Sequence, residues 1–509
     1  MSDTSKDFTI AIDEEPKSYY SPAPSTNDLP ERDQPQTRPS FWTKLSDFIT
    51  DWTPFGLVAS YFVFSVCIYM VCTETLISVF WFVYLATNFY ISAATVLEAF
   101  MSLEPCRQAR SVVQKAQEAN WKFPTPDDQV PILDLLVVAY LPNEKDIIMD
   151  RAMHALTRVV YPVDRIRINI LYNTPKPIEP LETELRELCL KHSQLRVIKV
   201  PNSTSKADNL NYFFSLDTGA DIVAIYDCDH YPHPHGPRWA VERFCQDKKV
   251  DIVQGRCVVF NSKDCLLAAM ISVEFDKIYA VSHPGRATLW DFGLFCGSNG
   301  YWRASLLKDL KMDGDMLTED IDSALRAVSR GANTVHDLNV VSYELAPTTL
   351  QGFWKQRLRW AQGWCQASIK HLKLAYRKSP DGTPRSPKVR FGLLSLLLIR
   401  ELSYYLVTQF TCLMIGFIIT KFPKDPVGLA RLIWFGYSVS VWLFIISVVC
   451  LIATLWITMR VRSEFVNLRM IIVFSILYPF YLVINATIGL YGHARQIVNY
   501  NSWNPTARS

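Results

Sequence analysis

Long uninterrupted apolar stretches are the first feature of this chain. Five of them contain no Asp, Glu, Lys or Arg, and they cover residues 55–73, 75–97, 402–420, 432–459 and 470–492. A helix needs about 20 apolar residues to cross the hydrocarbon core of a bilayer. One such stretch is compatible with a buried helix of a soluble protein, but five are not. The pattern predicts a multi-pass membrane protein with two spans in residues 53–100 and three in residues 402–495.

A sixth span is left open by the apolar residues 391–399, which end at Arg400 and Glu401. This short run is either a broken fourth span of the second group or part of the segment before it. A secretory signal peptide is not expected, because the first apolar stretch begins only at residue 55 and no small-residue cleavage site follows it.

The segments at the two ends differ from the spans. Residues 1–40 contain six prolines, eight acidic and four basic residues and no apolar periodicity, which predicts a disordered tail. Residues 41–52 carry apolar side chains at helical spacing, which favours an amphipathic helix in the membrane interface. A helix that packs on the protein core is the alternative. Residues 496–509 are interpreted as a C-terminal tail.

Between residues 101 and 345, short apolar runs alternate with helix-spaced segments. The runs predict strands at residues 133–139, 167–171, 196–200, 222–226 and 252–255. The segments between them predict helices at residues 146–160, 181–192 and 237–247. Such alternation is typical of α/β domains with a parallel sheet and helices on both faces. Ligands bind these sheets at the carboxyl ends of the strands, so we expect the chemistry there.

Charge and cysteine content narrow the class further. Lys and Arg number 52 and Asp and Glu number 49, so the net charge of +3 excludes a strongly basic nucleic-acid binder and an acidic disordered chain. The 12 cysteines are spread singly without a CxxC pair, which argues against a disulfide framework. We expect them to be reduced.

Two carboxylates directly follow the predicted strand at residues 222–226. Asp227 and Asp229 flank one residue on an extended chain, so both side chains can reach one hard cation. Mg²⁺ and Mn²⁺ prefer oxygen ligands together with the phosphates of a substrate. A DxD triplet also occurs in ordinary solvated loops. Its position at the carboxyl end of a strand favours the metal site.

A second acidic group, Thr318-Glu319-Asp320, opens a segment with helical spacing in which Thr318 takes the N-cap position. The acids either stabilise the helix dipole or provide a general base for an acceptor hydroxyl. The residues alone leave both interpretations open.

A basic and aromatic motif, QRLRW at residues 356–360, lies in the segment of residues 346–401, for which we predict interfacial helices. Arginines bind diphosphates in bidentate fashion, and an indole ring offers a flat face to a sugar. An interfacial helix with snorkelling arginines and an aromatic belt explains the same motif. The two interpretations are compatible.

Three histidines, His230, His233 and His235, follow the DxD triplet. Two prolines between them make this stretch a rigid loop rather than a helix face. A metal held by these histidines is therefore not favoured.

The order of the motifs is more specific than any one of them. DxD is followed by TED about 90 residues later, by QxxRW about 36 residues further, and then by the last apolar stretches. In this order the chain resembles the membrane-integrated processive family 2 glycosyltransferases, which are the cellulose, hyaluronan and chitin synthases and their fungal relatives. The resemblance covers roughly residues 55–495. It includes Tyr140, Glu144, the segment SKADNLN at residues 205–211, Val253-Gln254-Gly255 and Phe295-Cys296-Gly297-Ser298.

The resemblance implies an α/β GT-A fold, which is Rossmann-like, for a cytosolic domain inserted between the transmembrane helices. It implies inverting transfer of sugar from a UDP-sugar to the non-reducing end of a growing chain, with Mg²⁺ or Mn²⁺ held by Asp227 and Asp229. Asp320 would be the general base, with Glu319 beside it in the catalytic motif. The spans would form a channel for the polymer.

Roles for individual residues follow only from matching positions. The resemblance implies nucleotide binding by Tyr140, Glu144, Lys206, Asp227, Gln356, Arg357 and Arg359. It implies an acceptor site lined by Phe295, Cys296, Gly297, Ser298 and Trp360. One departure is clear, because Tyr172-Asn173 stands where the family has an acidic pair after the second strand. This departure puts nucleotide affinity or placement in doubt.

The product is left open at this stage. The TED and FCGS motifs lean toward the cellulose-synthase-like branch and UDP-glucose. The alternatives are a hyaluronan- or chitin-type synthase, a non-processive transferase acting on a lipid or protein, and a non-catalytic pore subunit. The expected partners are the UDP-sugar, the polysaccharide and the bilayer, with no nucleic acid, and with a homo-oligomer or accessory subunit left open. We expect a plasma-membrane protein with a cytoplasmic catalytic domain.

Overall fold

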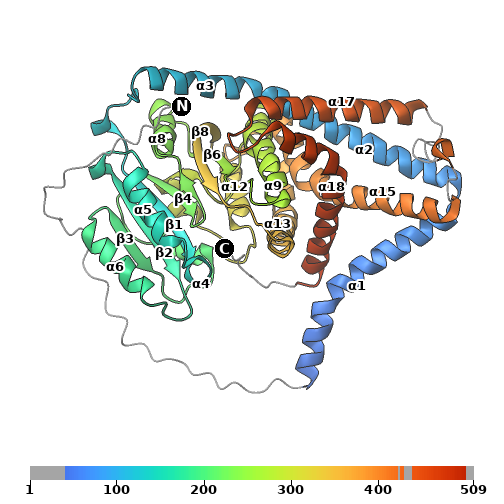
Figure 1. Cartoon of the computed structure of the whole chain (residues 1–509), viewed down its shortest axis with the longest axis horizontal. Helices are drawn as coiled ribbons and strands as arrows, with labels where there is room; N and C mark the ends of the chain where they lie inside the picture. The colour runs from blue at the N-terminus through green and yellow to red at the C-terminus, as the bar shows by residue number, and fades with distance from the viewer. Residues whose placement is uncertain (1–40, 422–424, 429–437, 500–509) are drawn as a thin grey trace.

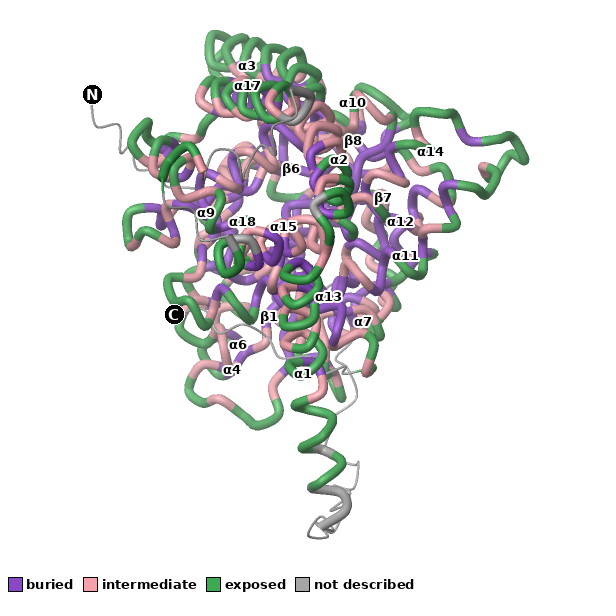
Figure 2. The backbone as a smooth tube through the Cα atoms, turned by 90° about the vertical axis from the view of Figure 1, so that its right-hand side faces the viewer, coloured by how far each residue is buried: buried purple, intermediate pink, exposed green. Residues whose placement is uncertain are grey.

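The structure is a computed structural model that describes residues 41–421, 425–428 and 438–499. It combines a domain built on an eight-stranded sheet with a set of long helices that extend from one side of that domain (Figure 1). Buried backbone is concentrated in the sheet, whereas long stretches of α1 and α3 are exposed (Figure 2). The two parts reflect the two patterns of the sequence.

Five helical stretches are long and apolar enough to cross a membrane, as the sequence predicts. They run over Phe48–Val71, Thr75–Glu118, Pro387–Thr420, Val441–Val461 and Leu468–Ile497. The helices themselves are α1 (Phe41–Val71), α2 (Glu74–Met101), α3 (Leu103–Glu118), α15 (Arg400–Lys421), α17 (Ser438–Val461) and α18 (Leu468–Ile497). Residues 432–437 of the fourth predicted span lie outside the described residues.

The described residues contain no separate sixth span. Helix α14 (Pro387–Leu394) continues through a π-helical turn at Ser395–Ile399 directly into α15. Arg400 and Glu401 therefore lie within one helical stretch instead of ending a span. Both charges are satisfied inside the protein, because Arg400 lies 3.9 Å above the Trp364 ring and Glu401 lies 2.7 Å from His493 Nε2.

Residues 41–52 do not form a helix of their own. They are the first turns of α1, which is continuous up to Val71 although Pro54 lies inside it. A proline removes one backbone hydrogen bond and kinks a helix, but the helical spacing on both sides keeps the helix going. Phe48 and Trp52 are more than half exposed. The interfacial placement of these turns stays a prediction.

The sheet has the strand order β3-β2-β1-β4-β7-β6-β8-β5. Its strands are β1 (Leu133–Tyr140), β2 (Ile166–Asn173), β3 (Leu195–Lys199), β4 (Ile222–Asp227), β5 (Tyr231–Pro232), β6 (Ile252–Val259), β7 (Gly300–Arg303) and β8 (Thr334–Glu344). All five predicted strands are confirmed. They are β1, β2, β3, β4 and β6.

The expectation of an entirely parallel sheet is wrong. Strands β1 to β4 pair in parallel, but β7 is antiparallel to both β4 and β6, and β5 is antiparallel to β8. The chain enters β7 after Gly297 and Asn299, both of which have positive φ angles. This turn reverses the chain direction just before the strand. The result is a mixed sheet, of the GT-A-like kind.

Helices cover both faces of the sheet, as the sequence predicts. The domain helices are α4 (Leu141–Glu144), α5 (Ile148–Arg158), α6 (Leu181–Lys191), α7 (Lys206–Phe214), α8 (Gly236–Gln246), α9 (Leu266–Lys277), α10 (His283–Trp290), α11 (Ala304–Leu310), α12 (Glu319–Ser329) and α13 (Leu350–His371). In β1, Leu135 joins the core on the side of α5 and α8, and Leu136 joins the core on the side of α7 and α12. The alternation follows from the two-residue period of a strand.

The domain and the spans are packed directly against each other. Helix α13 lies on α18 so closely that a Cβ at Gly492 would be 2.9 Å from the backbone nitrogen of Gln362. Helix α9 contributes to the same apolar cluster as α18, through Ile271 and Phe474. This contact places the motif at residues 356–360 between the sheet and the membrane helices.

Candidate active site

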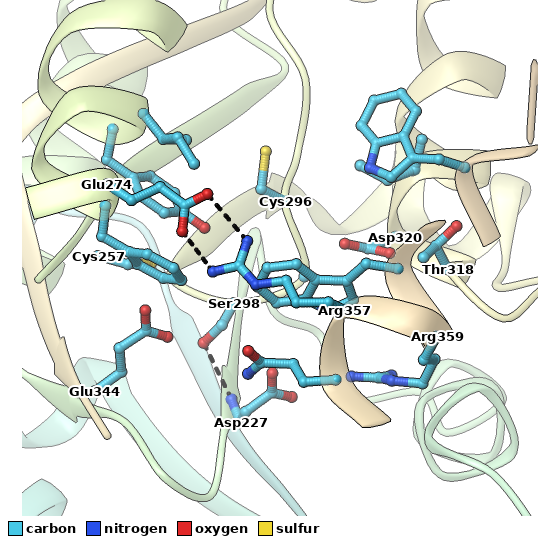
Figure 3. A pocket seen from close by; sticks show the side chains of 18 of the residues that line it. Asp227, Cys257, Glu274, Cys296, Ser298, Thr318, Asp320, Glu344, Arg357 and Arg359 are labelled. Atoms are coloured by element: carbon cyan, nitrogen blue, oxygen red, sulfur yellow. Dashed lines mark hydrogen bonds and ion pairs between the residues drawn. The ribbon is translucent and has the colours of Figure 1, made fainter. Parts of the chain in front are cut away.

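A cavity of about 530 Å³ lies where the sheet domain meets α13 and α18. Its wall includes Tyr140 and Asp227 at the ends of β1 and β4, Asp320 at the start of α12, Trp360 on α13 and Tyr478 on α18. Figure 3 shows the polar side chains converging on this space. The volume is in the range of small-molecule sites.

The DxD carboxylates meet at one point of the cavity wall. Asp227 ends β4, and its backbone nitrogen donates to Ser298 Oγ over 3.1 Å. Asp227, Asp229 and His230 each offer one ligand atom, and these atoms lie within 4.8 Å of one another. Asp229 is only 1% exposed. Buried carboxylates need a cation or a proton, so this donor set fits a divalent cation.

Lys206 lies beside these acids at the first position of α7, whose N-cap Ser205 accepts a hydrogen bond from the Asp208 nitrogen. Its ammonium contacts Asp227 and donates to the Gly297 carbonyl over 2.8 Å. Burial alone would lower the pKa of Lys206, but Asp227 and Glu319 hold it above its usual value. The amine therefore brings a permanent positive charge into the cavity.

Asp320 occupies the first turn of α12 and faces the cavity next to Gly297. A Cβ at Gly297 would lie 2.9 Å from Asp320 Oδ2, and Gly297 has φ +87°, so only glycine suits this close approach. Burial and the neighbouring Glu319 raise the pKa of Asp320 to about 7, against the opposite influence of Lys206 and Arg359. A carboxylate of this pKa suits general-base chemistry near neutral pH.

Thr318 is the N-cap residue of α12, as predicted, but its side chain makes no cap hydrogen bond. Its Oγ1 is buried and has no hydrogen-bond partner among the residues that the structure describes. Its side chain packs against Gly363 of α13. Packing between the two helices has taken priority over the local cap.

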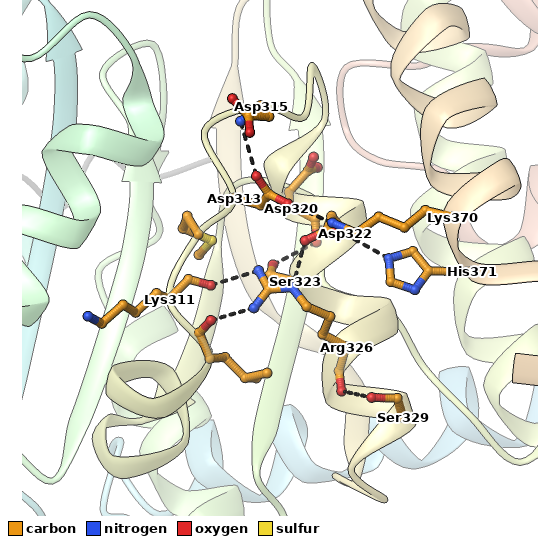
Figure 4. Close-up of polar contacts among 12 residues, drawn as sticks. Lys311, Asp313, Asp315, Asp320, Asp322, Ser323, Arg326, Ser329, Lys370 and His371 are labelled. Carbon is orange, nitrogen blue, oxygen red and sulfur yellow. Dashed lines mark hydrogen bonds and ion pairs between the residues drawn. The ribbon is translucent and has the colours of Figure 1, made fainter. Parts of the chain in front are cut away.

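Helix α12 is fixed on the side away from the cavity (Figure 4). Asp322 pairs with Arg326 at 2.6 Å and with Lys370 and His371 at 2.8 Å each. Burial opposes the charge of Asp322, but these partners hold its pKa well below the usual range. The two carboxylates of one helix turn thus have opposite environments, with Asp322 a structural anion and Asp320 facing the cavity.

Gln356, Arg357, Arg359 and Trp360 of the QRLRW motif line the cavity but face different neighbours, whereas Leu358 packs in an apolar cluster. Arg357 donates to both oxygens of Glu274, at 3.2 and 2.5 Å, and Tyr481 donates to the same carboxylate over 2.8 Å. The Arg357 guanidinium also lies 4.6 Å above the Trp360 ring. Arg359 lies on the Asp320 side of the motif, away from Glu274 (Figure 3). Of the two arginines of the motif, Arg357 is therefore the one whose charge is neutralised by Glu274.

The predicted acceptor turn is only partly in the cavity. Cys296, Gly297 and Ser298 line it. Phe295 does not, because it is 1% exposed and packs edge-on against Trp302 at 5.3 Å. The structure thus places Phe295 in the core, where it supports the turn and has no direct access to a ligand.

The predicted nucleotide residues Tyr140 and Glu144 also line the cavity. Glu144 Oε2 accepts a hydrogen bond from the Tyr140 nitrogen over 2.7 Å, which joins the last residue of the short helix α4 to its N-cap residue. Asn173 lines the cavity too, and Asn209 holds its amide oxygen over 2.9 Å. Tyr172 instead donates to Glu182 at 2.9 Å. The position after β2 therefore presents an amide where the family has a carboxylate.

The three histidines have different neighbours, although the His233 and His235 rings lie 6.0 Å apart. His230 lies 3.0 Å from Glu344 and from Ser342, next to the DxD acids. His235 instead stacks on Trp121 with ring centroids 4.0 Å apart. His230 therefore lies with the DxD acids, whereas His235 packs on an aromatic ring.

Several cavity residues carry no signal in the sequence. Glu274, Glu344, Tyr404, Tyr478 and Asn485 line the cavity from α9, β8, α15 and α18. Each is a single polar or aromatic residue in an otherwise ordinary helix or strand, so local pattern does not single it out. Only an intramembrane polar residue such as Asn485 offers a general hint, because such residues are costly in lipid.

The mixed sheet and the acidic cluster at its strand ends, joined to membrane helices, define a GT-A-like domain of a membrane protein. The family "Glycosyl transferase family group 2" matches residues 222–487, which include the DxD, TED and QxxRW motifs. The chain belongs to this family.

Curated relatives match about half of the chain at 26–27% identity. The chain is 26% identical over 249 residues to "Probable glycosyltransferase YdaM" of Bacillus subtilis (strain 168), which is 48% of this chain and 58% of the relative. It is 27% identical over 250 residues to a "Cellulose synthase catalytic subunit [UDP-forming]" of Xanthomonas axonopodis pv. citri (strain 306), covering 48% and 33%. It is 26% identical over 292 residues to "Probable glucomannan 4-beta-mannosyltransferase 6" of Oryza sativa subsp. japonica, covering 55% and 49%. The chain thus spans between a third and about three fifths of these relatives.

Proposed function

We propose that this chain is an inverting membrane glycosyltransferase that polymerises a UDP-sugar into a β-linked polysaccharide. The observation that carries the proposal is the shared cavity of Asp320, with a pKa raised to about 7, and the acid pair Asp227 and Asp229. A base for the acceptor, Asp320, and a charged site for a nucleoside diphosphate therefore line the same cavity. A protein without catalysis has no need of a carboxylate held near neutrality.

The donor binds on the sheet side of the cavity. Tyr140 and Glu144 border the nucleotide, and Lys206, Gln356 and Arg359 bind the diphosphate by charge and hydrogen bonds. Asp227 and Asp229 hold Mg²⁺ or Mn²⁺, which when bound supplies positive charge for the departing diphosphate. Arg357 pairs with Glu274, as Lys206 pairs with Asp227, but it also lies 4.6 Å above the Trp360 ring. We assign it to positioning Trp360.

Asp320 acts on the acceptor. Its carboxylate takes the proton of the attacking sugar hydroxyl while the bond between sugar and diphosphate breaks on the other face of the ring. One base is enough for such a direct displacement with inversion. Lys206 and Arg359 are already in place where negative charge develops on the leaving group, so little reorganisation is needed.

The polymer leaves toward the membrane helices. The cavity wall continues from Trp360 to Tyr404 on α15 and to Phe474, Tyr478 and Ile488 on α18. Aromatic rings offer flat apolar faces on which sugar rings stack without strong directional bonds. This continuity supports translocation through the chain's own spans. We place the catalytic domain on the cytoplasmic side of the plasma membrane, where the nucleotide sugar is on one side and the product on the other.

UDP-glucose is the proposed donor, since TED and FCGS lean to the cellulose-like branch. The relatives named as glucomannan mannosyltransferases make a mannose donor the second candidate. Hyaluronan- and chitin-type products need an amino-sugar donor.

The test offers UDP-glucose, UDP-GlcNAc, UDP-glucuronate and GDP-mannose, singly and in pairs, to purified full-length protein in nanodiscs with Mn²⁺ or Mg²⁺. Nucleotide release is measured, and products are sized and digested with linkage-specific hydrolases. UDP release from UDP-glucose with a high-mass product that a β-glucanase digests is the expected result. Release without a high-mass product would overturn the processive assignment, and no release with any donor would overturn the transferase assignment.

A further inference from the structure

A second pocket lies outside the catalytic cavity, at the opposite end of α12 from Asp320. It has a volume of about 380 Å³ and is formed by the end of α12, the 3₁₀ turn Leu372–Ala375 and the segment before α14. Four cationic side chains line it, which are Arg330, Arg377, Lys378 and Arg385. No acidic side chain lines it.

None of these four cations makes an ion pair with a carboxylate among the residues that the structure describes. Arg330, Arg377 and Lys378 are exposed. Like charges gathered without counter-charges repel one another, so an anion in their midst is favourable. The pocket therefore calls for a negatively charged ligand.

Arg385 gives an independent indication of such a ligand. It is only 9% exposed, and its Nη atoms donate to the carbonyls of Val328 and Ser329 at 3.3 Å each. Its Nε is buried and has no hydrogen-bond partner in the described part of the chain. Burial lowers the pKa of Arg385. A buried guanidinium without an anion is costly, and a phosphate oxygen at Nε would complete its hydrogen bonds.

The position of the pocket indicates where the anion comes from. The segment of residues 373–390 has six basic residues and one acidic residue, Asp381, which accepts hydrogen bonds from the Thr383 side chain and nitrogen. The third candidate span begins at Pro387. Tyr376 is 65% exposed and Phe391 is 46% exposed, on either side of the basic residues. Basic clusters next to a span, with exposed aromatics, favour an anionic lipid surface.

We propose that the pocket of Arg330, Arg377, Lys378 and Arg385 binds the phosphate group of an anionic membrane lipid. The shared chemistry is phosphate, which a soluble anion also carries. The adjoining span and the exposed aromatic side chains favour the lipid, because they hold the pocket at the level of the headgroups. Helix α14 lies at the periphery of the molecule, where lipid has access (Figure 2). The site does not depend on the proposed transferase function.

The test measures lipid binding to the full-length protein in detergent by native mass spectrometry, without any sugar donor. Phosphatidylinositol 4-phosphate is the probe, phosphatidylcholine is the zwitterionic reference, and inorganic phosphate is the soluble arm. Arg377→Gln with Lys378→Gln removes two exposed charges that support no fold contact. We expect this double variant to bind the probe about thirtyfold more weakly than wild type, with binding of phosphatidylcholine unchanged.

Lys248→Gln with Lys249→Gln is the matched control, since these two exposed lysines lie in the loop between α8 and β6. It is expected to bind the probe like wild type. Equal losses in both double variants would show general charge attraction and overturn the site, as would an unaffected Arg377/Lys378 variant. Competition by inorganic phosphate at the concentration of the probe would overturn the lipid source. Arg385→Gln is a supporting variant only, because it also removes contacts to the end of α12.

Discussion

The two walls of the catalytic cavity differ in the kinds of side chains that they carry. The sheet wall carries the charged groups Asp227, Asp320 and Lys206 at strand ends and helix N-termini. The helix wall, from α9, α13, α15 and α18, carries many rings, and its Arg357 pairs with Glu274 of α9 at 2.5 Å, while Arg359 and Arg400 also line it. In the proposed reaction, the charged groups lie where the bond between sugar and phosphate would break. The aromatic rings lie where an uncharged polymer would move.

The acidic groups of the site therefore lie mainly on the sheet wall, away from the aromatic side chains of the proposed product path. An uncharged sugar chain bound by many strong ion-dipole contacts would not slide, whereas stacking tolerates displacement along the chain. A change in one wall should therefore leave the function of the other wall intact.

Asp320→Asn should have the largest effect on the sheet wall. The amide keeps the shape of the side chain but cannot take a proton, so transfer should fall by about 10³- to 10⁴-fold. Binding of UDP, measured by calorimetry, should stay near normal. Asp315→Asn, an exposed change in the loop before α12, is the control and should keep full activity. Loss of UDP binding in the Asp320 variant would contradict the base role.

Asp229→Asn should reduce activity by about 10²- to 10³-fold, because it removes one ligand of the proposed divalent cation. Titration of Mn²⁺ by calorimetry should show weaker binding, and added EDTA should abolish activity in wild type. Asp309→Asn, exposed on α11, should change neither readout. Undiminished Mn²⁺ binding in the Asp229 variant would remove this residue from the metal site.

Trp360→Ala tests the helix wall. Polymer formation should fall by roughly thirtyfold, the loss of one stacking surface, whereas hydrolysis of the UDP-sugar should fall less than threefold. Both are measured on the same preparation, by product size and by UDP release. Trp354→Ala lies on the same helix outside the cavity wall and serves as the control. Equal loss of both activities would mean that Trp360 belongs to the donor side.

The pH profile tests the sheet wall without a mutation. The raised pKa of Asp320 means that the carboxyl is neutral, and inactive as a base, below about pH 7. The value of kcat/KM should therefore fall about tenfold per pH unit below this point and level off above it. The profile is measured between pH 5.5 and 8.5 at saturating Mn²⁺. A flat profile across this range would show that no group titrating near 7 limits the reaction.

Glu274→Gln should have the smallest effect, about three- to fivefold. It leaves Arg357 without its counter-charge, so an unpaired cation faces the product path beside Trp360. Mean product length should shorten while the rate of the first transfer stays close to wild type. Glu187→Gln, exposed on α6, controls for the loss of one negative charge. An unchanged product length would separate the pair from polymer movement.

Much of the fold could be predicted because its elements have strong local patterns. Strand β1 is a continuous apolar run, and the spans are long runs without charge, so both follow from hydrophobic burial. The mixed sheet could not be predicted, because β7 is only four residues long and its direction depends on the turn at Gly297 and Asn299. The joined α14–α15 stretch depends on tertiary support at Arg400, which lies over the Trp364 ring of α13.

Some features of the candidate site could likewise be predicted from the sequence, and others could not. The acids Asp227, Asp229 and Asp320 could be proposed because they follow a strand or open a helix, positions at which side chains reach ligands. The different environments of Asp320 and Asp322 could not, because Lys370 and His371 approach Asp322 from a helix about 50 residues further on. The burial of Phe295 likewise depends on Trp302 and the sheet behind it.

The amino-acid pattern alone predicts a membrane protein with an α/β domain, the acids that follow its strands, and the order of its motifs. These are local properties of burial and chain direction. The folded chain is needed to bring Glu274 to Arg357, to raise the pKa of Asp320 to about 7, and to gather four cations at the far end of α12. Electrostatic environment depends on distance and desolvation between segments remote in sequence, and no local pattern contains it.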